Sequence, residues 1–133
     1  MTRTILKHLI ILSCLFFAAC STPIKKGMKA YADADYETAV NELSRVESSN
    51  EDYDLAMAML AKAEYKMALQ AFKNAHDPKV LIEHIKKMIP LAMRTKSKEL
   101  LEEANKAIAD KLKETADMEL MKALMKEKLK FGF

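Results

Sequence analysis

Small and large apolar residues repeat along the first half of the chain at a spacing of 29 positions. The first copy is Gly27, Tyr31, Ala34, Asp35, Tyr36, Ala39, Leu43 and Val46, and the second is Ala56, Leu60, Ala63, Glu64, Tyr65, Ala68, Phe72 and Ala75. Two antiparallel helices need small residues where their backbones cross and large ones where they fill the gap between them. The pattern therefore predicts two helical hairpins, each turning at its acid–Tyr pair.

Capping residues set the expected helix boundaries. Side-chain oxygens at the start of a helix accept otherwise unpaired backbone N–H groups, and proline suits the first turn. The expected caps are Thr22, Asp35, Asn50 and Asp77, and the expected helices cover about 23–33, 36–47, 51–62, 64–75 and 78–90. Pro90 must end or kink the fifth helix, because proline has no N–H and clashes with the preceding turn.

One long helical pattern runs from Leu91 to Lys130. Its core-facing stripe is Leu101, Ala104, Ile108 and Leu112, at steps of three and four. Ser97 is suited to cap a new helix, and residues 115–117 are suited to break it. Two interpretations are open. These helices either form a degenerate third hairpin or cap the open apolar edge of the repeats.

The doubled pattern resembles the tetratricopeptide repeat family. The resemblance rests on a Gly and an aromatic residue in the first helix, followed by small-Asp-Tyr-x-x-Ala in the second. This chain repeats sooner than the family's roughly 34 residues, and it has no Trp. In that family the first helix of each repeat lines a groove for peptides or protein segments. Carried over, the expected partner-binding residues are Met28, Tyr31, Tyr53, Met57 and Leu60. The alternative is that helix five (78–90) and the next helix, within the pattern that begins at Leu91, fill this groove.

The N-terminal residues have the pattern of a targeting signal and not of a folded domain. Arg3 and Lys7 precede an apolar run, and Ala18-Ala19-Cys20 follows it. This resembles the lipobox of bacterial lipoproteins, which implies a signal peptide over 1–19 and lipidation of Cys20 by diacylglycerol and a fatty acid such as palmitate. Ser21 follows the cysteine instead of the Asp that resembles an inner-membrane retention signal. We therefore expect a periplasmic protein on the outer membrane. An ordinary secretory signal and a retained anchor are the alternatives.

The segment from Met118 to Phe133 mixes apolar residues with lysines. Its basic positions are Lys122, Lys126, Lys128 and Lys130. Such a helix suits an anionic membrane surface or a partner protein. The alternative is a helix that simply completes the fold, with lysines at its negative end.

Composition narrows the function. Only two Gly and three Pro in 133 residues favour an all-α fold, and a net charge of +3 gives no support for nucleic-acid binding. The sequence contains neither a phosphate-binding Gly-rich loop nor a nucleophile with an ordering base. His76 and His84 are too far apart to share a metal on one helical turn. We expect no enzyme, cofactor or metal.

The expected organisation is a lipidated start and short tether over 20–22, repeats over 23–77, and helices over 78–133 that complete the same domain. The expected function is to bind a protein or peptide partner at the envelope membrane. The alternative is a structural lipoprotein whose basic C-terminal helix engages lipid.

Overall fold

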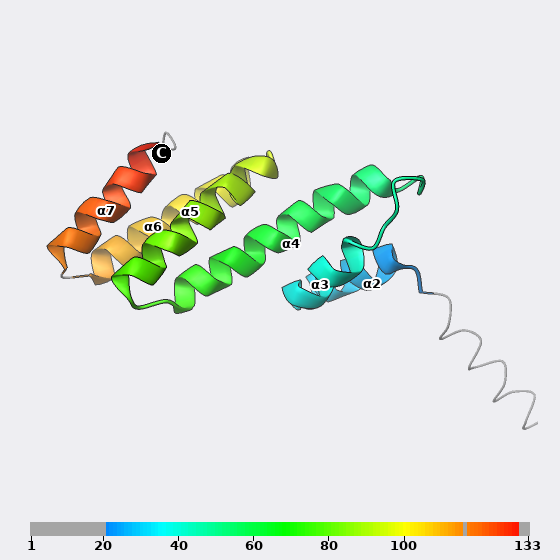
Figure 1. Ribbon diagram of the computed structural model, residues 1–133, viewed down its shortest axis with the longest axis horizontal. Coiled ribbons are helices and arrows are strands. Elements are labelled where there is room, and N and C mark those ends of the chain that lie inside the picture. Colours follow the sequence, from blue (N-terminus) through cyan, green and yellow to red (C-terminus); the bar gives the residue numbers. More distant parts are fainter. Residues whose placement is uncertain (1–20, 116, 131–133) are drawn as a thin grey trace, which may run out of the picture.

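The structure, a computed structural model, describes residues 21–115 and 117–130, and every regular element in this part of the chain is a helix. The predicted all-α class is therefore confirmed (Figure 1). The helices are α2 (Pro23–Ala32), α3 (Tyr36–Leu43), α4 (Tyr53–Asn74), α5 (Pro78–Arg94), α6 (Lys98–Glu114) and α7 (Met118–Lys130).

Most of the predicted caps are present. The Thr38 N–H donates to Asp35 Oδ1 at 3.1 Å, and the N–H groups of Lys79 and Val80 donate to Asp77 Oδ1 at 2.8 and 3.2 Å. Thr22 and Ser97 cap α2 and α6 in the same way. The prediction for Asn50 is wrong, because α4 begins after Asp52. Asn50 Oδ1 instead accepts the Asp52 N–H at 2.9 Å, within the preceding loop.

The first predicted hairpin forms through a compact turn. Ala34 has a left-handed φ of 59°. Its N–H donates to the Tyr31 carbonyl at 3.1 Å, and the Asp35 N–H donates to the Ala30 carbonyl at 2.9 Å. This pair of hydrogen bonds is the Schellman motif that closes a helix. Asp35 therefore ends one helix and caps the next, so α2 and α3 fold back on each other. The second of these helices ends at Leu43, short of the predicted Glu47.

The close packing of this hairpin depends on Gly27. A Cβ at this position would lie 2.5 Å from Cγ and 2.8 Å from Cδ2 of the fully buried Leu43. Real Cβ atoms do not approach other atoms so closely. Glycine therefore allows α2 and α3 to cross at short range, as the repeat pattern predicted.

The second predicted hairpin does not form. Its expected turn, Ala63-Glu64-Tyr65, lies inside α4, which continues for 22 residues without a break. Lys62, Ala63 and Glu64 are all strong helix formers. The residue that turns left-handed in the first copy, Ala34, is matched here by Ala63 within the helix. The helix partner of α4 is α5 instead (Figure 1).

Pro90 does not end α5, which continues to Arg94. The proline is exposed, and so is Lys86, whose carbonyl loses its helical N–H partner. Water can hydrogen-bond this carbonyl at the surface. The cost of an internal proline is therefore lower here than in a buried helix.

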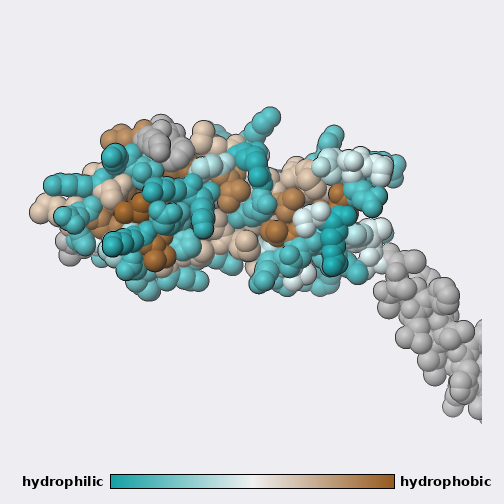
Figure 2. Space-filling view, in the orientation of Figure 1, coloured by the Kyte–Doolittle hydropathy of each residue, from teal (hydrophilic) through white to brown (hydrophobic). Residues whose placement is uncertain are grey.

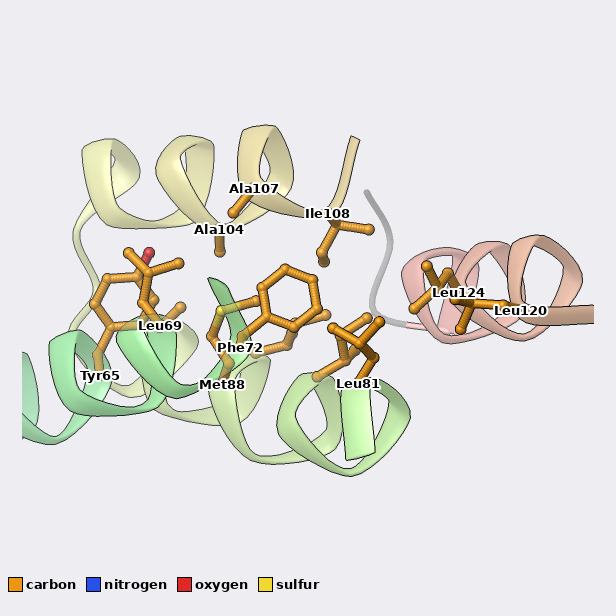
Figure 3. Packing of buried hydrophobic residues seen from close by; sticks show 13 residues of the cluster. Tyr65, Leu69, Phe72, Leu81, Met88, Ala104, Ala107, Ile108, Leu120 and Leu124 are labelled. Carbon is orange, nitrogen blue, oxygen red and sulfur yellow. The ribbon is translucent and has the colours of Figure 1, made fainter. Parts of the chain in front are cut away.

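The helices pack around two hydrophobic clusters that share α4. The N-terminal core lies between the α2–α3 hairpin and the first half of α4. Its buried residues are Ile24, Ala30, Ala39, Leu43, Val46, Ala56 and Ala63. The C-terminal core joins the second half of α4 to α5, α6 and α7 (Figure 3). Its largest fully buried side chains are Tyr65, Phe72, Ile85, Met88, Ile89, Ile108 and Leu124.

Candidate partner-binding surface

The five predicted groove residues lie on two helices. Met28 and Tyr31 belong to α2, and Tyr53, Met57 and Leu60 belong to α4. All except Met28 pack against the N-terminal core while staying partly exposed, and Met28 is 40% exposed. No Cα atom of α5, α6 or α7 lies within 8 Å of a Cα atom of α2 or α3. The backbones of α5 and α6 therefore do not pack closely against this hairpin.

Tyr31 makes an aromatic contact within the α2–α3 hairpin. Its ring meets the Tyr36 ring edge-on, with 5.5 Å between the centroids. Burial raises the pKa of the Tyr31 hydroxyl, with Lys66 opposing the rise and Tyr36 and Glu103 adding to it. Tyr31 therefore supports the hairpin turn and stays protonated at neutral pH.

One face of α4 stays partly open along almost the whole helix. Its residues follow each other at steps of four and three: Tyr53, Met57, Leu60, Glu64, Met67 and Ala71. None of these residues is buried. Side chains at this spacing share one face of a helix, which here extends for about 27 Å at 1.5 Å per residue. The same spacing forms the seam of helices that pack in coiled coils.

The second half of this face opens into a groove of about 590 Å³ between α4 and α5. Its apolar lining is Met67, Ala68, Ala71, Pro90 and Leu91, and its polar lining is Glu64, His84, Lys86 and Lys87. Small residues in the lining allow a partner backbone to approach closely. Figure 2 shows hydrophobic residues at the surface near the middle of the molecule and near the end that carries α7.

Sequence reasoning missed this groove because it placed Ala68 and Ala71 on a separate short helix. The unbroken steps of four and three from Tyr53 to Ala71 were the signal for one continuous helix with an open face. The groove also needs α5 beside α4. That pairing follows from the tertiary fold. The predicted turn at Ala63-Glu64-Tyr65 would instead have packed the two halves of α4 against each other.

Ion pairs fix the edges of the groove. Arg94 pairs with Glu64 where the end of α5 meets the middle of α4, and Lys86 Nζ lies 3.1 Å from Glu83 Oε1 along α5. Among the described residues, Lys87 has no acidic group within 4 Å. The groove is therefore apolar at its base and slightly basic at its rim.

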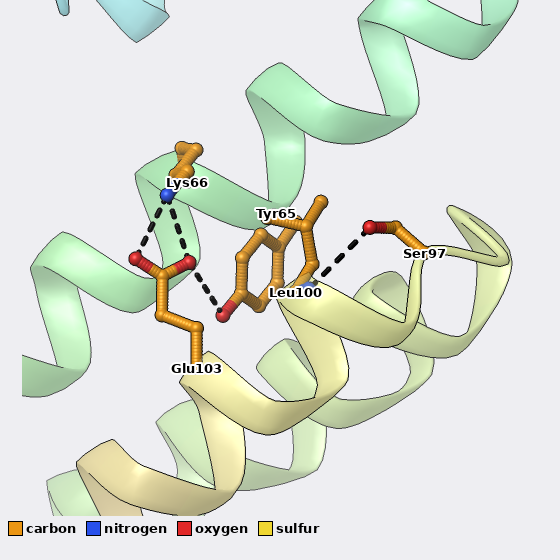
Figure 4. Close-up of polar contacts among 5 residues, drawn as sticks. All are labelled: Tyr65, Lys66, Ser97, Leu100 and Glu103. Atoms are coloured by element: carbon orange, nitrogen blue, oxygen red, sulfur yellow. Dashed lines mark hydrogen bonds and ion pairs between the residues drawn. The ribbon is translucent and has the colours of Figure 1, made fainter.

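A polar network on another side of α4 ties this helix to α6 (Figure 4). The Tyr65 hydroxyl donates to Glu103 Oε2 at 3.2 Å, and Lys66 Nζ lies 2.8 and 2.7 Å from the two Glu103 oxygens. Burial, followed by the negative charge of Glu103, raises the pKa of Tyr65 far above its ordinary value. Tyr65 therefore stays protonated at neutral pH and donates this hydrogen bond, so the network braces α4 against α6.

The C-terminal lysines fall on α7. Lys122 and Lys126 are exposed and Lys128 is half-buried, while the side chain of Lys130 lies outside the described residues. Cys20, the predicted lipidation site, also lies outside them. Within 21–115 and 117–130, no helix is long and apolar enough to cross a membrane. The same residues contain no cluster of three or more His, Cys, Asp or Glu suited to a metal.

Comparison of the chain with protein-family models, curated proteins and solved structures finds no match. The candidate surface therefore rests on geometry and sequence chemistry.

Proposed function

We propose that this protein is a lipid-anchored helical scaffold that binds an amphipathic helix of a protein partner along the open face of α4. The observation that carries the proposal is the partly exposed stripe from Tyr53 to Ala71, which leads into the α4–α5 groove. An amphipathic helix buries its apolar side in such a groove through residues spaced three and four apart. Met and Tyr side chains suit the role because they give contact area to partners of varied shape.

The α2–α3 hairpin, the copy of the repeat pattern that folds as predicted, supports a scaffold role. Two closely packed helix pairs, α2–α3 and α4–α5, follow one another along the chain, and each pair is joined by a short connection. In this register α2 and α4 are the first helices of the pairs. Partner binding by first helices is the property that the resemblance implies, and α4 carries most of the candidate surface.

Anchoring at Cys20 would hold this scaffold close to a bilayer. Thr22 already caps α2, so only Ser21 separates the proposed lipidated residue from the cap. Two or more acyl chains give stable attachment, because each buried methylene contributes about 0.8 kcal/mol. The partner would therefore be held within one domain's length of the membrane surface.

Site-specific photocrosslinking in the source cells tests the binding face. A photoreactive residue at Met57 or at Met67 should link the protein to the same partner. Lys73 is the matched control, because it is exposed and, by helical spacing, lies on the side of the same helix opposite the stripe. Met67→Asp should reduce the cross-link formed from position 57 by about tenfold, as expected for the loss of a central contact. Equal yields from all three positions, or different partners from Met57 and Met67, would refute the proposal.

A further inference from the structure

Helix α7 has two apolar stripes, of which the fold uses only one. Leu120 and Leu124 are buried in the C-terminal core. Met118, Met125 and Leu129 are 69%, 53% and 75% exposed. At 100° per residue these three side chains lie on the opposite side of the helix from Leu120 and Leu124.

The exposed stripe is unusual within this protein. Among the described residues, eight large hydrophobic side chains are exposed, and three of them belong to this one helix of 13 residues. Single exposed hydrophobic residues are ordinary, whereas a contiguous apolar surface marks an interaction site. The C-terminal core already has its contacts from Leu120 and Leu124, so packing does not account for the second stripe.

Lysines border the stripe. By helical spacing, Lys122 and Lys126 lie along one edge and Lys128 lies along the other. None of the three has an acidic group within 4 Å among the described residues, although seven lysines elsewhere do. Glu127 lies on the core side of the helix, and Glu119 is in its first turn. The surface beside the stripe is therefore basic.

We propose that this face of α7 rests on an anionic lipid bilayer. Met118, Met125 and Leu129 would enter the boundary between headgroups and acyl chains, while the lysine stems extend along it and place their ammonium groups at lipid phosphates. Charge complementarity selects the occupant, because the helix presents cations on both sides of a narrow apolar strip. This contact is separate from the protein-binding face of α4.

The position of α7 gives this contact a consequence for orientation. The start of α2 and the helix α7 lie at opposite ends of the long axis of the molecule (Figure 1). If Cys20 carries a lipid, as proposed above, the protein has a bilayer contact at each end. Its long axis would then lie along the membrane surface.

Vesicle binding by the unlipidated chain tests the proposal in the absence of a protein partner. Both cores lie within the described residues, so the chain from Ser21 to Phe133 serves for the measurement. We expect it to cosediment with vesicles of equal parts phosphatidylglycerol and phosphatidylcholine, and to do so weakly with phosphatidylcholine alone. Raised salt should weaken binding. Each of Lys122→Gln, Lys126→Gln and Lys128→Gln should lower the partition coefficient by about fivefold.

The matched control removes the same charge from α6. Lys98, Lys106 and Lys113 are exposed there, and each single Gln variant should lose less than about twofold. Met125→Ser with Leu129→Ser should also reduce binding while the helical circular dichroism is unchanged. Absence of binding to anionic vesicles, equal losses for the α6 and α7 lysine variants, or full binding by the Ser variant would each overturn the proposal. None of these outcomes bears on partner capture by α4.

Discussion

Single residues decide where the helices of this protein turn. Ala34 and Lys96 are the described non-glycine residues with positive φ, at 59° and 54°, and each lies immediately before a helix cap, Asp35 or Ser97. A left-handed conformation is strained for a residue with a Cβ. The hydrogen bonds of the turn and the following cap compensate for this strain.

Ala34→Gly should therefore stabilise the protein. Relief of the left-handed strain is worth roughly 1–2 kcal/mol, and the added flexibility of the unfolded chain removes about 0.4–1 kcal/mol of that gain. We expect the free energy of unfolding to rise by about 0.5–1 kcal/mol in urea denaturation. Ala58→Gly is the control, because Ala58 is a solvent-exposed residue in the interior of the α4 sequence. This substitution should lower the free energy of unfolding by about 1 kcal/mol. A loss from both substitutions would contradict the assigned turn.

At the scale of elements, the continuous α4 departs most from the sequence pattern. The copies around Tyr36 and Tyr65 match in residue type, yet one forms a hairpin and the other a single helix. In the first copy, Asp33-Ala34-Asp35 supplies acids suited to turns and caps. In the second copy, Lys62-Ala63-Glu64 favours helix at every position. Local chemistry at the turn therefore outweighs the similarity of the flanking core positions.

A distance measurement distinguishes the two arrangements. Spin labels at Leu55→Cys and Gln70→Cys, both exposed, should be about 22 Å apart between their Cα atoms on one helix. A hairpin at Ala63-Glu64-Tyr65 would bring them to about 10 Å. Residues 21–133 contain no other cysteine, so double electron–electron resonance reports this pair alone. A distribution centred at the shorter distance would show that the second hairpin forms.

At the scale of the whole molecule, two cores of unequal strength share one helix. Four of the seven buried residues of the N-terminal core are alanines, whereas the C-terminal core contains Tyr, Phe, Met and several Leu and Ile side chains. Burial of larger apolar side chains stabilises more. The α2–α3 hairpin should therefore open at lower free energy than the rest of the protein.

Hydrogen exchange should resolve this difference. Leu43→Ala should cost about 2–5 kcal/mol locally and reduce amide protection in α2, α3 and the first half of α4, leaving α5 to α7 protected. Ile108→Ala, at an equally buried site in the other core, should reduce protection in α5 to α7. Mass spectrometry of exchanged peptides measures both variants. A uniform loss of protection in each case would indicate a single cooperative unit.

Sequence alone determined the helical class, most of the caps, the first hairpin and the break at residues 115–117, because these features depend on contacts within a few residues. It also placed Tyr53, Met57 and Leu60 on one helix face. Tertiary structure decided that α4 pairs with α5, and this pairing creates the groove beside Met67 and Ala71. It also decided which side of α7 is buried. Those outcomes depend on which apolar helix faces pack against each other, and the packing faces belong to residues that are distant in the chain.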